Sequence, residues 1–510
     1  MRLVRNTFCT LLFTVAAFAQ SDRGTITGSV IDPAAAVVPG AKVSAKNLDN
    51  GSIFETTTTD TGNFTLASLP AGKYELNVEA SGFKKATHEN VEVAVAQTVR
   101  VDTALQVGAS SESVTVTAEA ALLKTENGEQ SMVIKGDKVN DLPLNFGGGG
   151  AAGGGIRNWL SFIMLAPGVS GTAYNAPING IPTGTYGNFK VYLEGQDSTS
   201  INDASWTSSV AAASVETITE FAVQSSNFSP EFGQVAGGFY NFTTKSGTNQ
   251  IHGSAYEQWA NEALDAAHPF SHLTDRDRKN DYGFTVGGPV WIPKLYNGRN
   301  KTFFFFGLER FANNQLSVSS YSTVPTAAYR QGNFAAALTG KTLTDPTSGM
   351  QFAENTIYDP NTTQTVNGLV IRTPFPGNII PTNRIDPVSA KIQNLIPAAI
   401  NTQTTLNWIP NIVTNTQQQI PSLKLDQNLS VKTKLSFFWT QQHTNQIAAP
   451  DGLPEPLTAS RPKIVSGDQY RLNADHTFSS TLIGHLGVGF YRFLNPDSSP
   501  AGVLNYDAVG

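Results

Sequence analysis

The stretch KTKLSFFWTQ, residues 432–441, decides the fold because apolar and polar side chains alternate along it. One face of the extended chain carries Leu435, Phe437 and Trp439, and the other carries Lys434, Ser436 and Thr440. The stretch TLIGHLGVGF, residues 481–490, repeats this alternation. A strand that separates lipid from a barrel lumen requires this pattern. A soluble β-sandwich has the same two-residue period, so periodicity alone leaves that alternative open.

The composition favours the membrane alternative. Charged residues make up only 15% of the 510 residues, compared with about 25% in typical soluble domains. No stretch reaches the roughly 18 consecutive apolar residues of a membrane helix. Since only helices and closed barrels satisfy the backbone inside a bilayer, we expect the chain to cross the membrane as strands, from about residue 251 onward.

The first 19 residues are typical of a secretory signal peptide. Arg2 and Arg5 form a short positive region, and residues 7–16 form an apolar run. Small residues precede a predicted cleavage between Ala19 and Gln20. The sequence therefore predicts export.

Export would also remove the single cysteine of the chain, Cys9. The mature protein would then have no disulfide and no thiolate metal site. Loss of two arginines changes the formal charge from −6 to −8. An acidic chain without basic blocks argues against nucleic acid as a partner.

Residues 24–105 predict a compact domain of about seven short strands. The apolar positions of these strands are Ile26, Val30, Val43, Ala45, Phe64, Leu66, Tyr74, Leu76, Val78, Val91, Val93, Val95, Val99 and Val101. Turn sequences separate the strands at residues 39–40, 49–51, 60–62 and 70–72.

The turns and strands of this segment, with VPGAKV at residues 38–43 and DTGNFTLASLPAGKYELNVEASGF at residues 60–83, resemble the carboxypeptidase regulatory-like domain. The resemblance implies a prealbumin-like β-sandwich at residues 20–107, often grouped with carbohydrate-binding-like folds. It implies a spacer or binding role and no peptidase activity. His88 and Glu89 lack a second histidine at the spacing that a zinc site needs.

A polar linker at residues 108–121 contains the segment ESVTVTA: Glu112, Ser113, Val114, Thr115, Val116, Thr117 and Ala118. Taken alone, this β-prone segment predicts another strand. Because it lies between the sandwich and a plug-like region, it looks like a TonB box. That resemblance implies a TonB-like periplasmic energy-transducing partner, which pairs with the segment by strand addition.

Residues 122–247 carry a series of motifs in a characteristic order. They are a glycine run at residues 147–155, NGIPTG at 179–184, VYLEG at 191–195, VETITEFAVQSSNFSPEFGQVAGG at 215–238 and NFTTKSGTNQIHGSAYE at 241–257. The ordered set resembles the plug-to-barrel passage of Oar-like TonB-dependent transporters and implies an α+β plug. A short amphipathic helix at residues 159–165 is expected in the plug core. One departure is Glu194-Gly195, where the family commonly has Asp-Gly.

The same resemblance continues through NKTFFFFGLERF at residues 300–311, TVPTAAYRQGNF at 323–334 and SLKLDQNLSVKTKLSFFW at 422–439. Residues 248–510 would form the N-terminal part of an antiparallel transmembrane barrel, with a long extracellular loop at about residues 317–418. A 22-stranded barrel needs about 220 residues of strand, at roughly ten per strand. The loop takes about 100 of the residues from 248 to 510, so the remaining residues are too few for these strands. We therefore expect an incomplete barrel and a partial gene product.

Two sets of residues imitate catalytic or metal sites. Ser81, Ser225 and Lys245 begin motifs that follow the order of penicillin-binding enzymes, but the last two motifs lie too close together. His268 and His272, with Asp265, Asp275 and Asp277, are better explained as a solvated loop, because Pro269 disfavours the helix that would align the histidines. We predict no catalytic residues, no metal site and no cofactor.

The sequence thus predicts a mainly β chain in the outer membrane of a Gram-negative cell: signal peptide, periplasmic sandwich, plug and partial barrel. The leading hypothesis is a TonB-dependent receptor for an unidentified ligand, such as a glycan, peptide or chelate. Its other partners would be membrane lipid and the barrel assembly machinery. The alternative is a barrel-anchored adhesion or envelope-organising protein. A secreted peptidase would need a constellation that the sequence lacks.

Overall fold

A computed structural model of the chain describes residues 23–109, 112–117, 126, 128–136, 138, 162, 165–170, 189–199, 213–228, 232–233, 235–269, 272–318, 321–346, 348–449, 451–454, 457–458, 460, 462–494 and 496. The predicted signal peptide, with its cleavage between Ala19 and Gln20, lies outside these residues, as do Ala118 and the glycine run. The described chain is mainly β, as predicted. No helix among the described residues has the length and apolarity to cross a bilayer.

The N-terminal domain is a two-sheet sandwich. One sheet contains β4 (Asn63–Leu69), β1 (Gly24–Ile31) and β7 (Thr98–Arg100) in that order, with β8 (Thr103–Ala104) also paired to β1. The other has the order β3 (Ile53–Thr57), β2 (Lys42–Asn47), β5 (Gly72–Glu79), β6 (Lys85–Val93) and β9 (Ser113–Thr117). Every apolar strand position singled out in the sequence is buried here, because alternate side chains of both sheets face the shared core.

The sandwich sheet extends past the boundary expected at residue 107. Residues 113–117, predicted to lie in a linker, form β9 and pair in parallel with β6. The physical reason is local: Val114, Thr115 and Val116 favour extended backbone, and the edge of β6 offers unpaired hydrogen-bonding groups to any extended segment nearby.

The described part of residues 122–247, the segment predicted to be a plug and called the plug below, contains a five-stranded sheet. Its order is β10 (Gln130–Lys135), β13 (Ile218–Ser226), β14 (Gly238–Thr244), β11 (Phe189–Leu193) and β12 (Gln196–Asp197). One face packs on a core that includes Phe221 and Phe242, whose ring centroids are 4.9 Å apart. Most of the predicted helix at residues 159–165 is outside the described residues, but Phe162 is fully buried in this core. A short 3-10 turn, η4 (Val215–Thr217), leads into β13.

The largest sheet is a seven-stranded antiparallel meander. Its order is β15 (His252–Ala260), β16 (Arg276–Pro289), β19 (Thr302–Ser317), β24 (Ile412–Asn428), β25 (Thr433–Ala449), β26 (Lys463–Ser479) and β27 (Leu482–Leu494). Several strands have 17 residues, more than the ten expected. At about 3.3 Å per residue such a strand is roughly 56 Å long, so it extends beyond the apolar band of a membrane, about 25 Å in height.

On β24, β25 and β26 the buried side chains are mostly polar, the inverse of a soluble protein, whereas β19 also buries Phe303, Phe305 and Phe311. The buried side chains of β25 are mostly polar: Ser436, Thr440, Gln442 and Thr444, together with Phe438. On β27 the exposed side chains are mostly apolar, with Arg492 as the exception: Leu482, Leu486, Val488, Phe490 and Leu494. Burial of polar groups against a plug and exposure of apolar groups match a membrane barrel wall. This inversion excludes the soluble-sandwich alternative, in which the apolar face is the buried one.

One short hairpin and a lobe complete the described part of the chain. β17 (Trp291–Ile292) pairs with β18 (Tyr296–Asn297) in a turn between β16 and β19. The lobe occupies residues 318–411, between β19 and β24, and contains two small hairpins and two helices: β20 (Thr342–Thr344) with β21 (Gln351–Ala353), β22 (Gln364–Val366) with β23 (Leu369–Ile371), α3 (Ala327–Arg330) and α4 (Pro387–Leu395). Single 3-10 turns lie at η5 (Glu262–Leu264), η6 (Ala335–Ala337), η7 (Pro360–Thr362), η8 (Pro376–Asn378) and η9 (Thr382–Arg384). The lobe ends earlier than the residue 418 expected, because residues 412–418 continue the ladder of β24 on β19.

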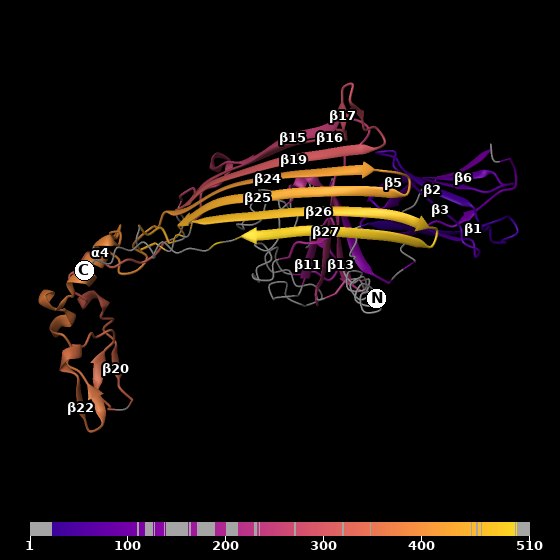
Figure 1. Cartoon of the computed structure of the whole chain (residues 1–510). Coiled ribbons are helices and arrows are strands. Elements are labelled where there is room, and N and C mark those ends of the chain that lie inside the picture. The colour runs from indigo at the N-terminus through magenta and orange to yellow at the C-terminus, as the bar shows by residue number, and fades with distance from the viewer. Residues whose placement is uncertain are drawn as a thin grey trace, which may run out of the picture.

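Figure 1 shows how these parts are arranged. The sandwich lies at one end of the long strands and the lobe at the other, while β11 and β13 of the plug lie along one face of the sheet. In an outer-membrane protein with a periplasmic N-terminal domain, this arrangement places the lobe on the extracellular side.

Candidate functional site: an edge strand between sandwich and plug

β9 carries the described part of the predicted TonB-box-like segment. Its register places Ser113 opposite Lys85, Thr115 opposite Thr87 and Thr117 opposite Glu89. The carbonyl of Glu112, just before the strand, accepts a hydrogen bond of 2.9 Å from the N–H of Lys85. The Glu112 carboxylate also pairs with Lys84 at 2.8 Å, in an exposed position where such a pair contributes little.

β9 is an edge strand. Within the described residues it pairs only with β6, so a row of backbone N–H and C=O groups on its other side is available to another strand. Ser113 and Thr115 are exposed and Val114 is half-buried. A partner that recognises extended backbone could add to this segment by β-augmentation.

The sandwich is attached to the plug close to the plug's first strand. Glu220 of β13 accepts a hydrogen bond of 2.5 Å from the N–H of Val95, in the sandwich turn after β6. Burial raises the pKa of Glu220 to about 7, and the nearby Glu92 carboxylate acts in the same direction. Lys135 at the end of β10 forms an ion pair with Glu92 of β6.

The sandwich is also attached to the turns of the barrel wall. Asn249, before β15, donates a 2.8 Å hydrogen bond to the carbonyl of Asn50, and Asn428 donates one of 2.8 Å to Ser52. Gly51 sits in a left-handed conformation (φ 71°) between these contacts, and a Cβ there would lie 2.7 Å from Oδ1 of Asn300. Glycine therefore allows the turn between β2 and β3 to approach the wall closely.

A buried ion pair joins the plug to the wall. Glu194, in the turn between β11 and β12, is fully buried, and its Oε1 lies 2.9 Å from Nζ of Lys424 on β24. The same oxygen accepts hydrogen bonds from the N–H and hydroxyl of Thr244, at 2.6 and 2.8 Å. Burial acts to raise the pKa of Glu194, but the Lys424 ammonium, the Arg23 charge and the Thr244 N–H together outweigh it and hold this pKa below its usual value.

Two further polar side chains of the wall, Glu309 and Gln469, also bind the plug. Glu309 of β19 accepts hydrogen bonds from the hydroxyl of Ser214, at 2.7 Å, and from the N–H of Val215 at the start of η4. On β26, Gln469 donates to the carbonyl of Leu193 at 2.9 Å and accepts from Ser198 at 2.7 Å. The wall is therefore fixed to the plug through its lumen-facing residues.

Glu194 was visible in the sequence as a departure from the family pattern, whereas Lys424 and Glu309 were not predicted. The signal in the sequence was a charged residue within an apolar stretch: Lys424 lies between Leu423 and Leu425, and Glu309 follows the continuous run FFFFGL. A charge in an otherwise polar and uncharged strand face is expected to have a partner inside the barrel.

Two of the residues that imitate a metal site, Asp275 and Asp277, bind other groups of the protein. Asp275 accepts hydrogen bonds from the Ser317 hydroxyl and the Val318 N–H, and Asp277 pairs with Lys279 at 2.8 Å. In the part of the chain that the structure describes, no group of three or more metal-ligating side chains is arranged around a common point.

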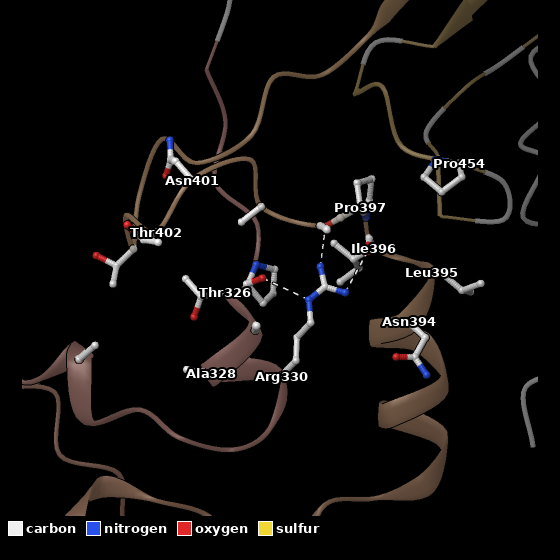
Figure 2. Close-up of a pocket in the computed structure, with 16 residues that line it drawn as sticks. Thr326, Ala328, Arg330, Asn394, Leu395, Ile396, Pro397, Asn401, Thr402 and Pro454 are labelled. Atoms are coloured by element: carbon white, nitrogen blue, oxygen red, sulfur yellow. Dashed lines mark hydrogen bonds between the residues drawn. The ribbon is translucent and has the colours of Figure 1, made fainter.

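The lobe contains an open cavity of about 800 Å³, lined by residues of α3, of the end of α4 and of the segment after it. Figure 2 shows Arg330 pointing toward the end of α4. Its guanidinium donates to the backbone carbonyls of Gln393, Ile396 and Pro397, at 2.5 to 2.9 Å, and to that of Pro325 at 3.2 Å. Arg330 thus satisfies the C-terminal carbonyls of the helix, and its donors are engaged within the lobe.

Known proteins resemble the chain in two regions. The family described as "Outer membrane beta barrel domain" matches residues 243–509, which are 267 of the 510 residues. The family described as "Carboxypeptidase regulatory-like domain" matches residues 25–106.

The TonB-dependent transporter Oar of Myxococcus xanthus is 30% identical over 300 residues, which are 56% of this chain and 27% of that protein. The chain thus spans about a quarter of the length of this relative. A ferric enterobactin receptor (PfeA) mutant from Pseudomonas aeruginosa overlaps 72% of this chain and 41% of its own, at 9% identity and a TM-score of 0.39. A putative carbohydrate-binding protein from Bacteroides uniformis overlaps 17% of this chain and 41% of its own, at 19% identity and a TM-score of 0.15.

The inverted burial of the seven-stranded wall, the plug bound to its polar face and the match over more than half of the chain agree with one another. The chain belongs to the outer membrane β-barrel family, carries a carboxypeptidase regulatory-like domain at its N-terminal side and is located in the outer membrane.

Proposed function

We propose that this chain acts as a TonB-dependent receptor and that β9 is the segment engaged by a TonB-like periplasmic energy-transducing protein. The observation that carries the proposal is the edge strand itself: β9 ends only 12 residues (118–129) before β10, the first strand of the plug sheet. A strand-adding partner could therefore take hold of the chain directly ahead of the plug. The 30% identity to a TonB-dependent transporter over the matched region supports the same function.

In this mechanism a ligand binds the extracellular lobe and the outer surface of the plug, and the TonB-like protein pairs with the segment from Val114 to Ala118. Pulling on that segment then remodels the plug. The lobe offers neutral, amide-rich surfaces and exposed apolar side chains, such as Val370 and Leu406. Such surfaces are compatible with a glycan, a peptide or a chelate.

The test replaces one residue of β9 and measures partner binding. Val116→Pro removes a backbone N–H and so disrupts strand addition, whereas the control Val116→Thr keeps the N–H and the β-branched shape. The probe is the purified periplasmic domain of the host's TonB-like protein, applied to the full chain in outer-membrane vesicles. We expect Val116→Pro to abolish binding and Val116→Thr to retain it. Equal binding by both variants would show that β9 is not the TonB box.

A further inference from the structure

We propose that the sandwich holds β9 in reserve, and that the energy-transducing protein takes this strand by displacing it from β6 and not by adding to its open edge. This inference rests on the proposed function of β9 as the TonB box. It assigns to the regulatory-like domain a role in controlling access to that segment. Three features of the structure lead to it.

The first feature is the low cost of releasing β9. Its ladder with β6 has five register pairs and is parallel, a pairing slightly less stable per residue than an antiparallel one. The buried core of the sandwich extends from Ile26 to Leu105 and, among side chains whose burial is described, includes none from β9. Loss of the strand therefore removes no side chain from this described core, which the rest of the domain keeps.

The second feature is that β6 is suited to become an edge strand after release. On its other side β6 remains paired with β5 from Ala86 to Val93, with one irregularity at Glu89 and Asn90. Lys85, Glu89 and Glu92 lie along β6, and charged residues on an edge strand discourage pairing with other chains. The exposed sheet would thus be protected from aggregation while β9 is engaged elsewhere.

The third feature is the path that a pulling force would follow. The sandwich is attached to the barrel wall through Asn249 and Asn428 and to the plug through Glu220. If β9 stayed on β6, a pull on β9 would transmit force to the whole sandwich and to these contacts. If β9 is released, the pull passes along the connection to β10, which is the edge strand of the plug sheet and pairs only with β13 among the described strands.

The exchange conserves hydrogen bonds. The backbone groups of β9 that pair with β6 would pair with the incoming strand, so the released strand is not left with unsatisfied groups. Addition to the open edge would leave the β6 ladder intact and would need no exchange. A covalent lock between β6 and β9 separates the two routes.

The experiment uses the double variant Thr87→Cys/Thr115→Cys, whose two positions are directly opposite in the ladder. The single native cysteine, Cys9, lies in the predicted signal peptide, so the exported double variant would carry only the new pair. The matched control is Thr27→Cys/Thr65→Cys, which joins β1 to β4 at another opposed threonine pair and leaves β9 free. Binding of the purified periplasmic TonB-like domain is measured for each full chain, oxidised and reduced, in outer-membrane vesicles.

Oxidation of Thr87→Cys/Thr115→Cys is expected to weaken binding by about tenfold or more, and reduction should restore it. The control should bind equally in both states. Equal binding by the locked and reduced forms would overturn the proposal in favour of addition at the open edge, with β9 still the TonB box. If the unlocked Val116→Pro chain binds like the wild type, the proposed function fails, and this inference fails with it.

Discussion

At the scale of single residues, the charges that matter are buried ones whose partners come from distant parts of the chain. Lys424 and Glu194 are 230 positions apart and are both almost inaccessible to solvent. Glu220 of the plug contacts a backbone N–H of the sandwich 125 positions away. Glu194 connects the plug to the wall, and Glu220 connects the plug to the sandwich. Each contact leads to a prediction that can be measured.

Lys424→Met is expected to destabilise the attachment of the plug to the wall. Removal of one partner leaves the Glu194 carboxylate buried without its counter-charge, which costs about 3–5 kcal/mol. Protease resistance of the plug and urea unfolding in vesicles would measure the loss. The control Lys432→Met removes an exposed lysine from the nearby turn and should change neither. Similar stability of the two variants would contradict a structural role for the pair.

Glu220 predicts a pH dependence of opposite sign to that of most carboxylates. The unfolded chain loses this proton near pH 4.5, whereas burial keeps it in the folded protein up to about pH 7. Between these values the folded state binds more protons, so the free energy of unfolding falls as pH rises. The charged neighbours are Glu92, which adds to the shift, and Lys135, which opposes it.

In the wild type we expect the free energy of unfolding to fall by up to about 3 kcal/mol between pH 4.5 and pH 7. In Glu220→Gln this fall should be absent. Urea unfolding of both chains at pH 5 and pH 8 measures the difference. A variant with the same pH dependence as the wild type would show that the Glu220 carboxyl titrates normally.

At the scale of secondary-structure elements, neighbouring residues of one strand meet different environments. On β25, Phe438 is buried in the core cluster of the plug, whereas Phe437 lies on the other face of the wall. The alternation of KTKLSFFWTQ was visible in the sequence, and the faces of Leu435 and Ser436 agree with it. The insertion of Phe438 into the plug was not visible in the sequence. A phenylalanine on a lumen face only interrupts the alternation, and the sequence does not show which residues it contacts.

Phe438→Ala should therefore loosen the plug at a cost of about 3–5 kcal/mol, because a large buried ring leaves a cavity behind. Phe437→Ala is the matched control, with the same atoms removed from the lipid-facing side. Urea unfolding in vesicles and trypsin sensitivity of the plug compare the two. A larger plug defect in Phe437→Ala would reverse the assignment of the faces.

β9 illustrates the limit of local patterns. Five β-prone residues predict a strand, but nothing in them names the strand with which they pair. The boundary predicted at residue 107 can be tested by expressing residues 20–107 and 20–117 separately. Because the described core ends at Leu105, we expect both fragments to fold, with similar thermal midpoints in circular dichroism. An unfolded shorter fragment would mean that β9 is part of the domain and not a reserve strand.

At the scale of the whole molecule, the barrel wall buries polar side chains against the plug and exposes apolar ones. These exposed apolar side chains need lipid around them. Val488 of β27 is 60% exposed, and a lysine there would cost about 2–4 kcal/mol if the position lies near the middle of the bilayer. Val488→Lys should lower the yield of folded chain in lipid vesicles, measured by heat-modifiable gel migration. Thr481→Lys, in the turn before β27, is the control and should fold normally.

The sequence by itself determined the mainly β fold, the two faces of the strands at residues 432–441 and 481–490, the core of the sandwich and the membrane location. These properties depend on the character of residues one or two positions apart, which alternation records directly. Only the tertiary structure decided that β9 pairs with β6, that Lys424 meets Glu194 and that Glu220 holds the sandwich to the plug. Such contacts join residues separated by tens to hundreds of positions, and edge strands or lone charges accept many partners. Which partner is reached depends on how the domains pack together.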